Sequence, residues 1–209
     1  MPLVRPSLVL LLVAGLLLGP TLVLGTHITH SAPENLTYAT QASEQFRAGI
    51  LFPRWMPDSY NGLGGPSLFF YPPLAFLIDA LVSVVTLDVL PVSYRLALTS
   101  LLLLWASGLT MHAWLRRVTE DGRAALVGAA VYMAAPYHLL DHYMRGAFAE
   151  FTAYTVLPLV MLVIRLVVDG RRVGPPLLAL SYAILVFAHL PTTLLASVTV
   201  IPAYVLFCT

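Results

Sequence analysis

Charge is scarce in this chain, and lysine is absent from it. Only 10% of the 209 residues are charged and 59% are hydrophobic, whereas charged residues make up about 25% of a typical soluble domain. All eleven basic residues are arginines and the formal net charge is +1, which argues against a nucleic-acid partner. The single cysteine, Cys208, excludes a disulfide bond within the chain. This composition indicates an integral membrane protein.

Long apolar runs predict the membrane-spanning helices. The runs that we interpret as spans are Leu8–Leu24, Val92–Leu115, Ala124–Tyr137, Ala147–Val168, Pro175–Ala188 and Thr192–Phe207. The first run also resembles a cleaved signal peptide, but no A-x-A-like site follows it. We expect an all-α polytopic, multi-pass bundle of about six transmembrane helices, with residues 1–209 as a single membrane domain. Because the sequence stops directly after an apolar run, we expect it to be the N-terminal part of a longer protein.

A further apolar run, Leu68–Leu87, decides the orientation of the chain. If it crossed the membrane, the later turns would carry their arginines outside, against the excess of basic residues in cytoplasmic loops. If Tyr71–Leu87 instead lies along the outer interface or re-enters, the following arginines all fall inside: Arg5, Arg116, Arg117, Arg123, Arg171 and Arg172. Asp79 favours this interpretation, since a charge is costly in a span. We therefore expect a cytoplasmic N-terminus and a first extracytoplasmic loop, residues 26–91, with an interfacial or re-entrant helix.

The least lipid-like part of the chain lies inside this loop. After a short predicted helix, Leu36–Ala48, prolines and glycines interrupt the stretch Gly49–Leu74. Such backbone is not tolerated against lipid, because each unpaired N–H or C=O group there costs several kcal/mol. The aromatic residues of the stretch suit an interfacial belt or a stacking surface for a sugar or an isoprenoid. We interpret the stretch as the floor of a site at the membrane surface.

Polar residues that are unusual for a membrane protein gather on this predicted outer side and suggest an extracytoplasmic site. Asp141 and Arg145, four residues apart, would pair on one helical face, either structurally or functionally. Arg145 also precedes a predicted span, and a helix N-terminus favours a phosphate. Glu34 and Glu44 are the only carboxylates of the loop before Pro53, and either is a candidate general base. The candidate substrate-binding residues are His30, Arg54, Trp55, Tyr71, Asp141, His142, Arg145, Glu150 and His189.

Histidine pairs are the remaining candidates for chemistry. His27 with His30, and His138 with His142, have spacings found among metal ligands, but no third ligand accompanies either pair. We predict no metal site and no other cofactor, and a divalent metal stays an open alternative.

Four motifs in these regions resemble one family of bacterial proteins. They are G-x-x-x-P-R-W at Gly49–Trp55, G-L-G-x-P-x-x-F-F-Y-P-P-L at Gly62–Leu74, Y-H-L-L-D-H-Y-M-R-G-A-F-A-E at Tyr137–Glu150 and H-L-P-T at His189–Thr192. Over residues 26–202 the chain resembles the 6-pyruvoyl-tetrahydropterin synthase-related multi-pass membrane proteins, although nothing in it is similar to the soluble pterin enzyme. The architecture of that family is similar to the type C (GT-C-like) membrane glycosyltransferases, which carry a catalytic acid in a large first outer loop.

This resemblance implies a glycosyltransferase-like protein of the bacterial cell membrane that uses a polyprenyl-phosphate-linked sugar on the outer face, in contact with membrane lipid. Arg145 and the start of the following helix would hold the phosphate, and Glu34 or Glu44 would act as the base. The chain departs from the family in the first loop, where many relatives have a His-Asp pair and this sequence has His30-Ser31. The alternative is a non-catalytic lipid or glycan carrier, a flippase or an envelope-assembly membrane protein.

Overall fold

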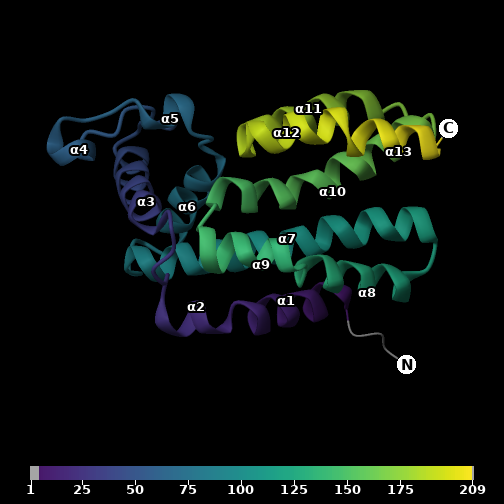
Figure 1. Ribbon diagram of the computed structural model, residues 1–209, viewed down its shortest axis with the longest axis horizontal. Helices are drawn as coiled ribbons and strands as arrows, with labels where there is room; N and C mark the ends of the chain where they lie inside the picture. Colours follow the sequence, from purple (N-terminus) through teal and green to yellow (C-terminus); the bar gives the residue numbers. More distant parts are fainter. Residues whose placement is uncertain (1–4, 209) are drawn as a thin grey trace.

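The computed structural model describes residues 5–208, and its regular structure is helical apart from one isolated bridge between Met56 and Gly65 (Figure 1). The helices are α1 (Pro6–Leu17), α2 (Gly19–Leu24), α3 (Ala32–Arg47), α4 (Ser59–Gly62), α5 (Ser67–Phe70), α6 (Leu74–Val85), α7 (Val92–Thr119), α8 (Gly122–Met133), α9 (Pro136–Leu140), the π-helical turn η1 (Asp141–Arg145), α10 (Phe148–Val168), α11 (Gly174–Ala188), α12 (Leu190–Val198) and α13 (Val200–Cys208). The predicted all-α class is confirmed for these residues.

Two of these helices, α7 and α10, are long and apolar enough to cross a membrane. The α12–α13 pair is a third candidate if its 41° bend lies within one span. Residues 5–208 therefore contain fewer such helices than the six predicted spans. Helices α8 and α11 have 12 and 15 residues, or about 18 and 22 Å at 1.5 Å per residue. The first predicted span is divided between α1 and α2, because Pro20 lacks the N–H group that would continue α1.

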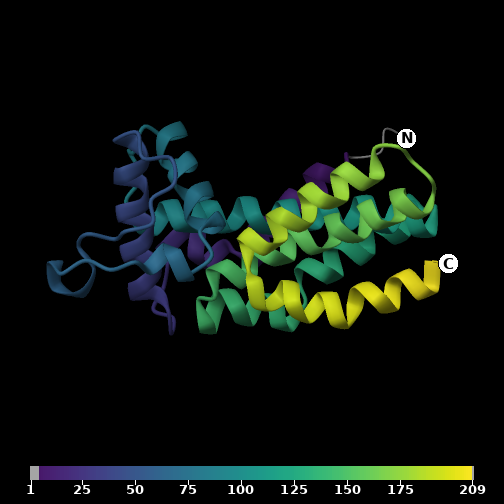
Figure 2. The ribbon, with the colours of Figure 1, turned by 90° about the horizontal axis from the view of Figure 1, so that it is seen from above.

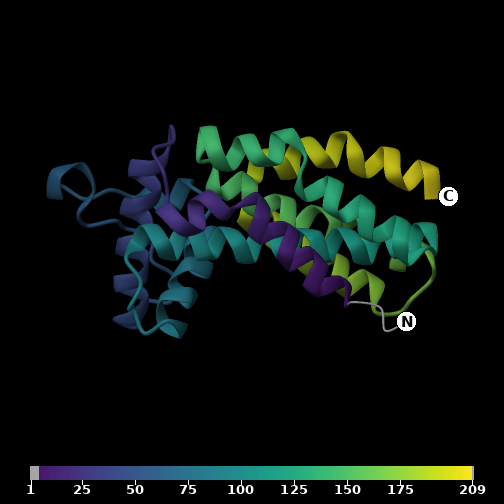
Figure 3. The same ribbon diagram turned by 90° about the horizontal axis from the view of Figure 1, so that it is seen from below.

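Helix α7 lies at the centre of the bundle, between α10 on one side and α8 and α1 on the other (Figures 1 and 3). Leu10, Leu104 and Met133 are fully buried where α1, α7 and α8 meet. Gly108 of α7 lies directly against the side chain of Met133, and a Cβ atom there would collide with it. A small residue at this position therefore allows the two helices to approach closely.

Helices α3 to α6 gather beyond one end of this bundle (Figures 1 and 2). Phe76 of α6 is fully buried there. Its ring lies 5.6 Å from that of Tyr38, 5.9 Å from that of Tyr71 and 5.8 Å from that of Phe148, measured between centroids. This aromatic cluster attaches α3 and α6 to the start of α10. Helix α6 is the helix that the sequence predicts at the interface.

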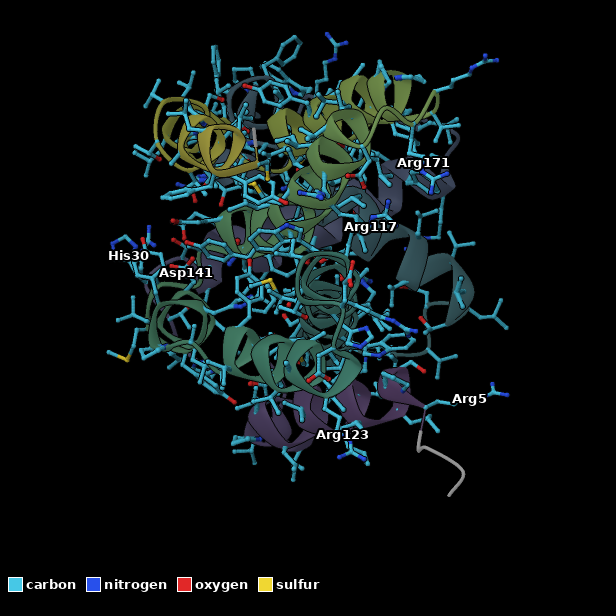
Figure 4. The ribbon with its side chains drawn as sticks, turned by 90° about the vertical axis from the view of Figure 1, so that its right-hand side faces the viewer. Arg5, His30, Arg117, Arg123, Asp141 and Arg171 are labelled. Carbon is cyan, nitrogen blue, oxygen red and sulfur yellow. The ribbon has the colours of Figure 1, made fainter. Side chains whose placement is uncertain are left out.

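The opposite end of the bundle carries the arginine-rich turns, one between α7 and α8 and one between α10 and α11. Arg117 and Asp169 connect the two turns with an N–O distance of 2.5 Å. Figure 4 looks onto this end, and it labels Arg5, Arg117, Arg123 and Arg171 there. The arginines that the sequence analysis assigns to one side of the membrane therefore lie together at one end of the molecule.

One buried ion pair joins α6 to α7. The Nε atom of Arg95 lies 2.9 Å from Oδ2 of Asp79, and these side chains are 4% and 0% exposed. Arg95 also donates to the carbonyl of Ala39 at 3.0 Å and to Asp88 at 3.1 Å, while the Thr99 hydroxyl donates to Asp79 at 3.1 Å. From the sequence, Asp79 is expected at an interface, because a charge is costly within a membrane span. The structure instead buries this carboxylate and compensates it with a buried guanidinium.

Candidate functional site

A cluster of charged side chains surrounds Arg145 at the end of η1. Its Nη1 atom donates hydrogen bonds to Asp141, to Oε2 of Glu150 at 2.7 Å and to the hydroxyl of Tyr137 at 2.9 Å. Gly146 follows with φ of +65°, a left-handed conformation that glycine adopts without strain, and the chain then turns into α10. The predicted pair of Asp141 and Arg145 is present, and Glu150 extends it to three charges.

Glu150 is the carboxylate of this cluster that is held by tyrosines. The hydroxyls of Tyr137 and Tyr154 donate to its Oε1 atom at 3.1 and 3.2 Å. Two carboxylates and one guanidinium give the cluster a formal charge of −1, so Arg145 is not a free cation. A phosphate that bound to Arg145, as the sequence analysis expects, would have to displace a carboxylate.

Asp141 has the most strongly altered environment in the cluster. It is fully buried. Burial and the charge of Glu150 raise the pKa of Asp141 to about 6, against the opposing effect of Arg145. Burial, with a smaller effect from His27, lowers the pKa of the adjacent His142 to about 4. A buried acid with a raised pKa beside a histidine with a lowered pKa is a combination found at functional sites.

Two residues from distant segments join this cluster. Tyr71, in the turn before α6, has its hydroxyl against the backbone of the first turn of α10, where burial raises its pKa and the charges of Glu150 and Arg145 act on it. His189, at the break between α11 and α12, lies within electrostatic range of the same two charges, and burial lowers its pKa. The first loop, the Arg145 turn and His189, which the sequence analysis places in one site, are therefore neighbours in the structure.

A groove of about 250 Å³ adjoins the cluster at Tyr71. Aromatic rings of the first loop, including Phe52 and Phe69, line it opposite Phe187 of α11. The guanidinium of Arg54 lies over these loop rings, 4.8 Å from the centroid of Phe52 and 5.3 Å from that of Phe69. None of the ion pairs within residues 5–208 involves Arg54. The groove therefore combines an apolar lining with one positive charge that a ligand can use.

The side chains of four other predicted site residues form no hydrogen bond or ion pair with Asp141, Arg145 or Glu150 in the described part of the chain, although the backbone N–H of His30 donates to the carbonyl of Met144 in η1 at 3.2 Å. Glu34 is exposed in the first turn of α3. Glu44 lies ten residues later, about 15 Å along the helix, beside a separate cavity of about 400 Å³ that Arg47 also lines. His30 and Trp55 are exposed, and neither lines the groove. The two predicted bases are thus at opposite ends of one helix, and Glu44 is at the end away from the Arg145 turn.

Residues that the sequence analysis did not select complete the cluster. Asn35 donates to the carbonyl of Gly146 at 2.7 Å, and the hydroxyl of Thr29 lies close to the same glycine, so the start of α3 is attached to the η1 turn. Tyr154 follows Glu150 by four residues, a helical spacing that is visible in the sequence. The positions of Asn35 and Thr29 depend on tertiary packing alone.

The histidines of the two predicted pairs contact other residues of the chain through hydrogen bonds and ring packing. His142 forms a hydrogen bond with the hydroxyl of Thr21 at 2.9 Å, and His27 forms one with the carbonyl of Tyr143 at 2.8 Å. His138 packs edge-on against Phe151 with 4.8 Å between ring centroids. Across the described part of the chain, no three His, Cys, Asp or Glu side chains are arranged to hold a metal ion.

Comparison with known proteins assigns no family to the chain. It matches no family model, and no curated protein or solved structure matches it.

Proposed function

We propose that this chain is a glycosyltransferase-like protein of the cell membrane, which receives a polyprenyl-phosphate-linked sugar at the end of the bundle where α3 to α6 gather. The observation that carries the proposal is the position of Tyr71. This residue lines the groove that contains Arg54, and it also faces the charges of Glu150 and Arg145. The proposed site for the lipid phosphate therefore lies next to the carboxylate cluster.

The groove has the composition that an isoprenoid phosphate requires. Aromatic and aliphatic side chains dominate its lining, and apolar area buried there contributes about 25 cal/mol per Å². A guanidinium binds phosphate oxygens through two parallel hydrogen bonds, and Arg54 is placed for this role. Its packing on Phe52 and Phe69 keeps the charge beside the groove before the ligand binds, so less side-chain entropy is lost on binding.

Glu150 is the general base in this proposal. It takes the proton of the acceptor hydroxyl, the acceptor oxygen bonds to the anomeric carbon, and the bond from that carbon to the phosphate oxygen breaks, so polyprenyl phosphate leaves. Tyr137 and Tyr154 hold Oε1 of Glu150 and Arg145 holds Oε2, which keeps the carboxylate in one orientation. Glu150 is preferred to Glu34 and Glu44 because it lies within the cluster, and Arg145 becomes a positioning residue.

The distribution of arginines supports an extracytoplasmic site. The arginine-rich turns and the α3–α6 end lie at opposite ends of the candidate spans α7 and α10 (Figures 1 and 4). Basic residues are in excess on the cytoplasmic side of membrane proteins, and this supports an orientation with the groove outside and the N-terminus inside. We also propose membership of the 6-pyruvoyl-tetrahydropterin synthase-related family, whose resemblance includes the motifs around Tyr71 and Arg145.

Sugar transfer in membranes that contain the protein and a labelled polyprenyl-phosphate sugar tests this function. Glu150→Gln should lower turnover by about 10²- to 10⁴-fold, the usual contribution of a general base, and Arg54→Gln should raise the apparent KM. Glu120→Gln, in the turn at the other end of the bundle, is the matched control and should keep the wild-type rate. Unchanged turnover in Glu150→Gln would refute the assignment, and loss of turnover in Glu44→Gln alone would return the role to Glu44.

A non-catalytic role as a lipid or glycan carrier, a flippase or an envelope-assembly protein is the alternative. The charge compensation within the cluster favours it, since Arg145 pairs with both Asp141 and Glu150 and such a group also stabilises a fold. Under this alternative the groove binds the prenyl phosphate lipid, no variant or wild-type protein transfers sugar, and Glu150→Gln lowers the melting temperature without a change in lipid affinity.

A further inference from the structure

A small cavity of about 30 Å³ lies beside Asp141, between η1, the segment before α3 and the first turns of α7. Thr29, His27 and His142 contribute its polar lining, and Phe151 contributes to its apolar wall. A cavity holds a water molecule when about 10–15 Å³ is open to the centre of a water-sized probe. The space beside Asp141 is therefore large enough for about two water molecules.

Two polar atoms of this lining have no hydrogen-bond partner among residues 5–208. They are Oδ2 of Asp141 and Oγ1 of Thr29. Asp141 is fully buried, and its other oxygen accepts the hydrogen bond from Arg145. An unpaired oxygen of a buried carboxylate is unfavourable, because this oxygen has lost its hydration and only the other oxygen has gained a hydrogen bond in exchange. The cavity therefore needs a hydrogen-bond donor of its own.

The two unpaired oxygens define which ligand fits the cavity. An ionised carboxylate oxygen can only accept a hydrogen bond, whereas the hydroxyl of Thr29 can accept or donate one. The cavity therefore presents Oδ2 of Asp141 and Oγ1 of Thr29 to a small ligand that can donate two hydrogen bonds.

We propose that this cavity is an internal water site, in which one or two water molecules donate hydrogen bonds to Asp141 Oδ2 and connect it to the hydroxyl of Thr29. Such water stabilises the ionised form of Asp141. The ionised carboxylate in turn keeps its hydrogen bond with Arg145, the residue that orients Glu150. The water site stands on the cavity and its unpaired oxygens, and only this last consequence, for the orientation of the base, rests on the proposed function.

Charged and titratable groups from four elements face Asp141 and act on its ionisation together with the water. They are Arg145 and His142 of η1, Tyr137 of α9, Glu150 and Tyr154 of α10 and His27 before α3. Arg145 favours the ionised carboxylate and Glu150 opposes it. Because none of these groups is altered by a change at Thr29 or Ser100, two other residues of the cavity wall, such changes isolate the effect of the water.

Difference infrared spectroscopy of the chain in detergent micelles tests the water site. The carbonyl band of the protonated Asp141 carboxyl is followed as a function of pH, and Asp141→Asn identifies the band. Thr29→Val removes one partner of the water with little change in volume, and Ser100→Val fills part of the cavity. Both should raise the midpoint of the titration by about one pH unit, which is a tenfold increase in proton affinity. Thr37→Val, on the exposed face of α3, is the matched control and should leave the midpoint unchanged.

The outcomes separate this inference from the proposed function, since the titration needs no sugar donor. Midpoints equal to that of the wild type in both Thr29→Val and Ser100→Val would overturn the water site, whether or not the protein transfers sugar. A raised midpoint in a protein without transfer activity would support the water site and count against the glycosyltransferase proposal. Thermal melting of each variant confirms that it is folded, and Ser100→Val alone decides the result if Thr29→Val does not fold.

Discussion

Substitution of Asp79 by alanine leaves the guanidinium of Arg95 buried without its closest carboxylate. The pair has an N–O distance of 2.9 Å, and the two side chains are 0% and 4% exposed. Removal of one partner from a buried ion pair costs about 3–5 kcal/mol, because the remaining charge is uncompensated. Arg95 retains its hydrogen bonds to Asp88 and to the carbonyl of Ala39, so we expect the lower part of this range, about 3–4 kcal/mol.

Thermal unfolding in detergent micelles, followed by tryptophan fluorescence, measures this loss. For a chain of 209 residues, 1 kcal/mol corresponds to about 2–4 °C, so Asp79→Ala should melt roughly 6–16 °C below the wild type. Asp169→Ala is the matched control, since its partners Arg117 and Arg165 are 38% and 35% exposed and ion pairs that are open to solvent contribute little to stability. If Asp79→Ala lost no more stability than Asp169→Ala, the conclusion that this pair holds α6 on α7 would be refuted.

Gly146→Ala should lower the free energy of unfolding by about 1–3 kcal/mol in the same assay, because φ there is +65° and a Cβ atom would meet the Thr29 hydroxyl; wild-type stability would contradict this. The pKa of Asp141 is raised from 3.8 to about 6, so the folded chain binds more protons than the unfolded chain between these values. Its free energy of unfolding should therefore fall by about 3 kcal/mol as the pH rises through that window. Asp141→Asn should remove this contribution, so the pH dependence of chemical unfolding measured at several pH values should differ from that of the wild type by this amount, and an unchanged pH dependence would count against the assignment. A reporter fused after Leu87 should give an external signal and one after Arg117 a cytoplasmic signal, and the reverse pattern would overturn the orientation.

Helix positions could be predicted well where one apolar run forms one helix. Helix α7 starts at Val92 directly after a proline, and α10 ends at Val168 before Asp169-Gly170, as the sequence predicts. The number of long helices could not be predicted from hydropathy, because a continuous apolar run can contain a helix break and can extend beyond the end of its helix. Pro20 divides the first run, and α8 ends at Met133, short of the predicted Tyr137.

The individual contacts within the candidate site were predictable only where its residues are neighbours along the chain. The tyrosines that hold Glu150 include Tyr154, one helical turn later. Glu34 and Glu44, by contrast, are predicted as bases because they are the only acids of the loop before Pro53. This reasoning says nothing about the distance from either carboxylate to Arg145. The structure places them at opposite ends of α3, whereas the carboxylate of Glu150 is hydrogen-bonded to Arg145.

The amino-acid sequence alone determined the helical class, an apolar character compatible with a membrane, and the pair of Asp141 and Arg145, since these depend on composition and on contacts within about one helical turn. Only the tertiary structure decided that Tyr71 and His189 lie within electrostatic range of Arg145 and Glu150 and that Glu44 lies at the far end of α3. Their positions depend on how α3, α6 and α11 pack against α7 and α10, and the apolar side chains that make those contacts are much alike throughout the chain.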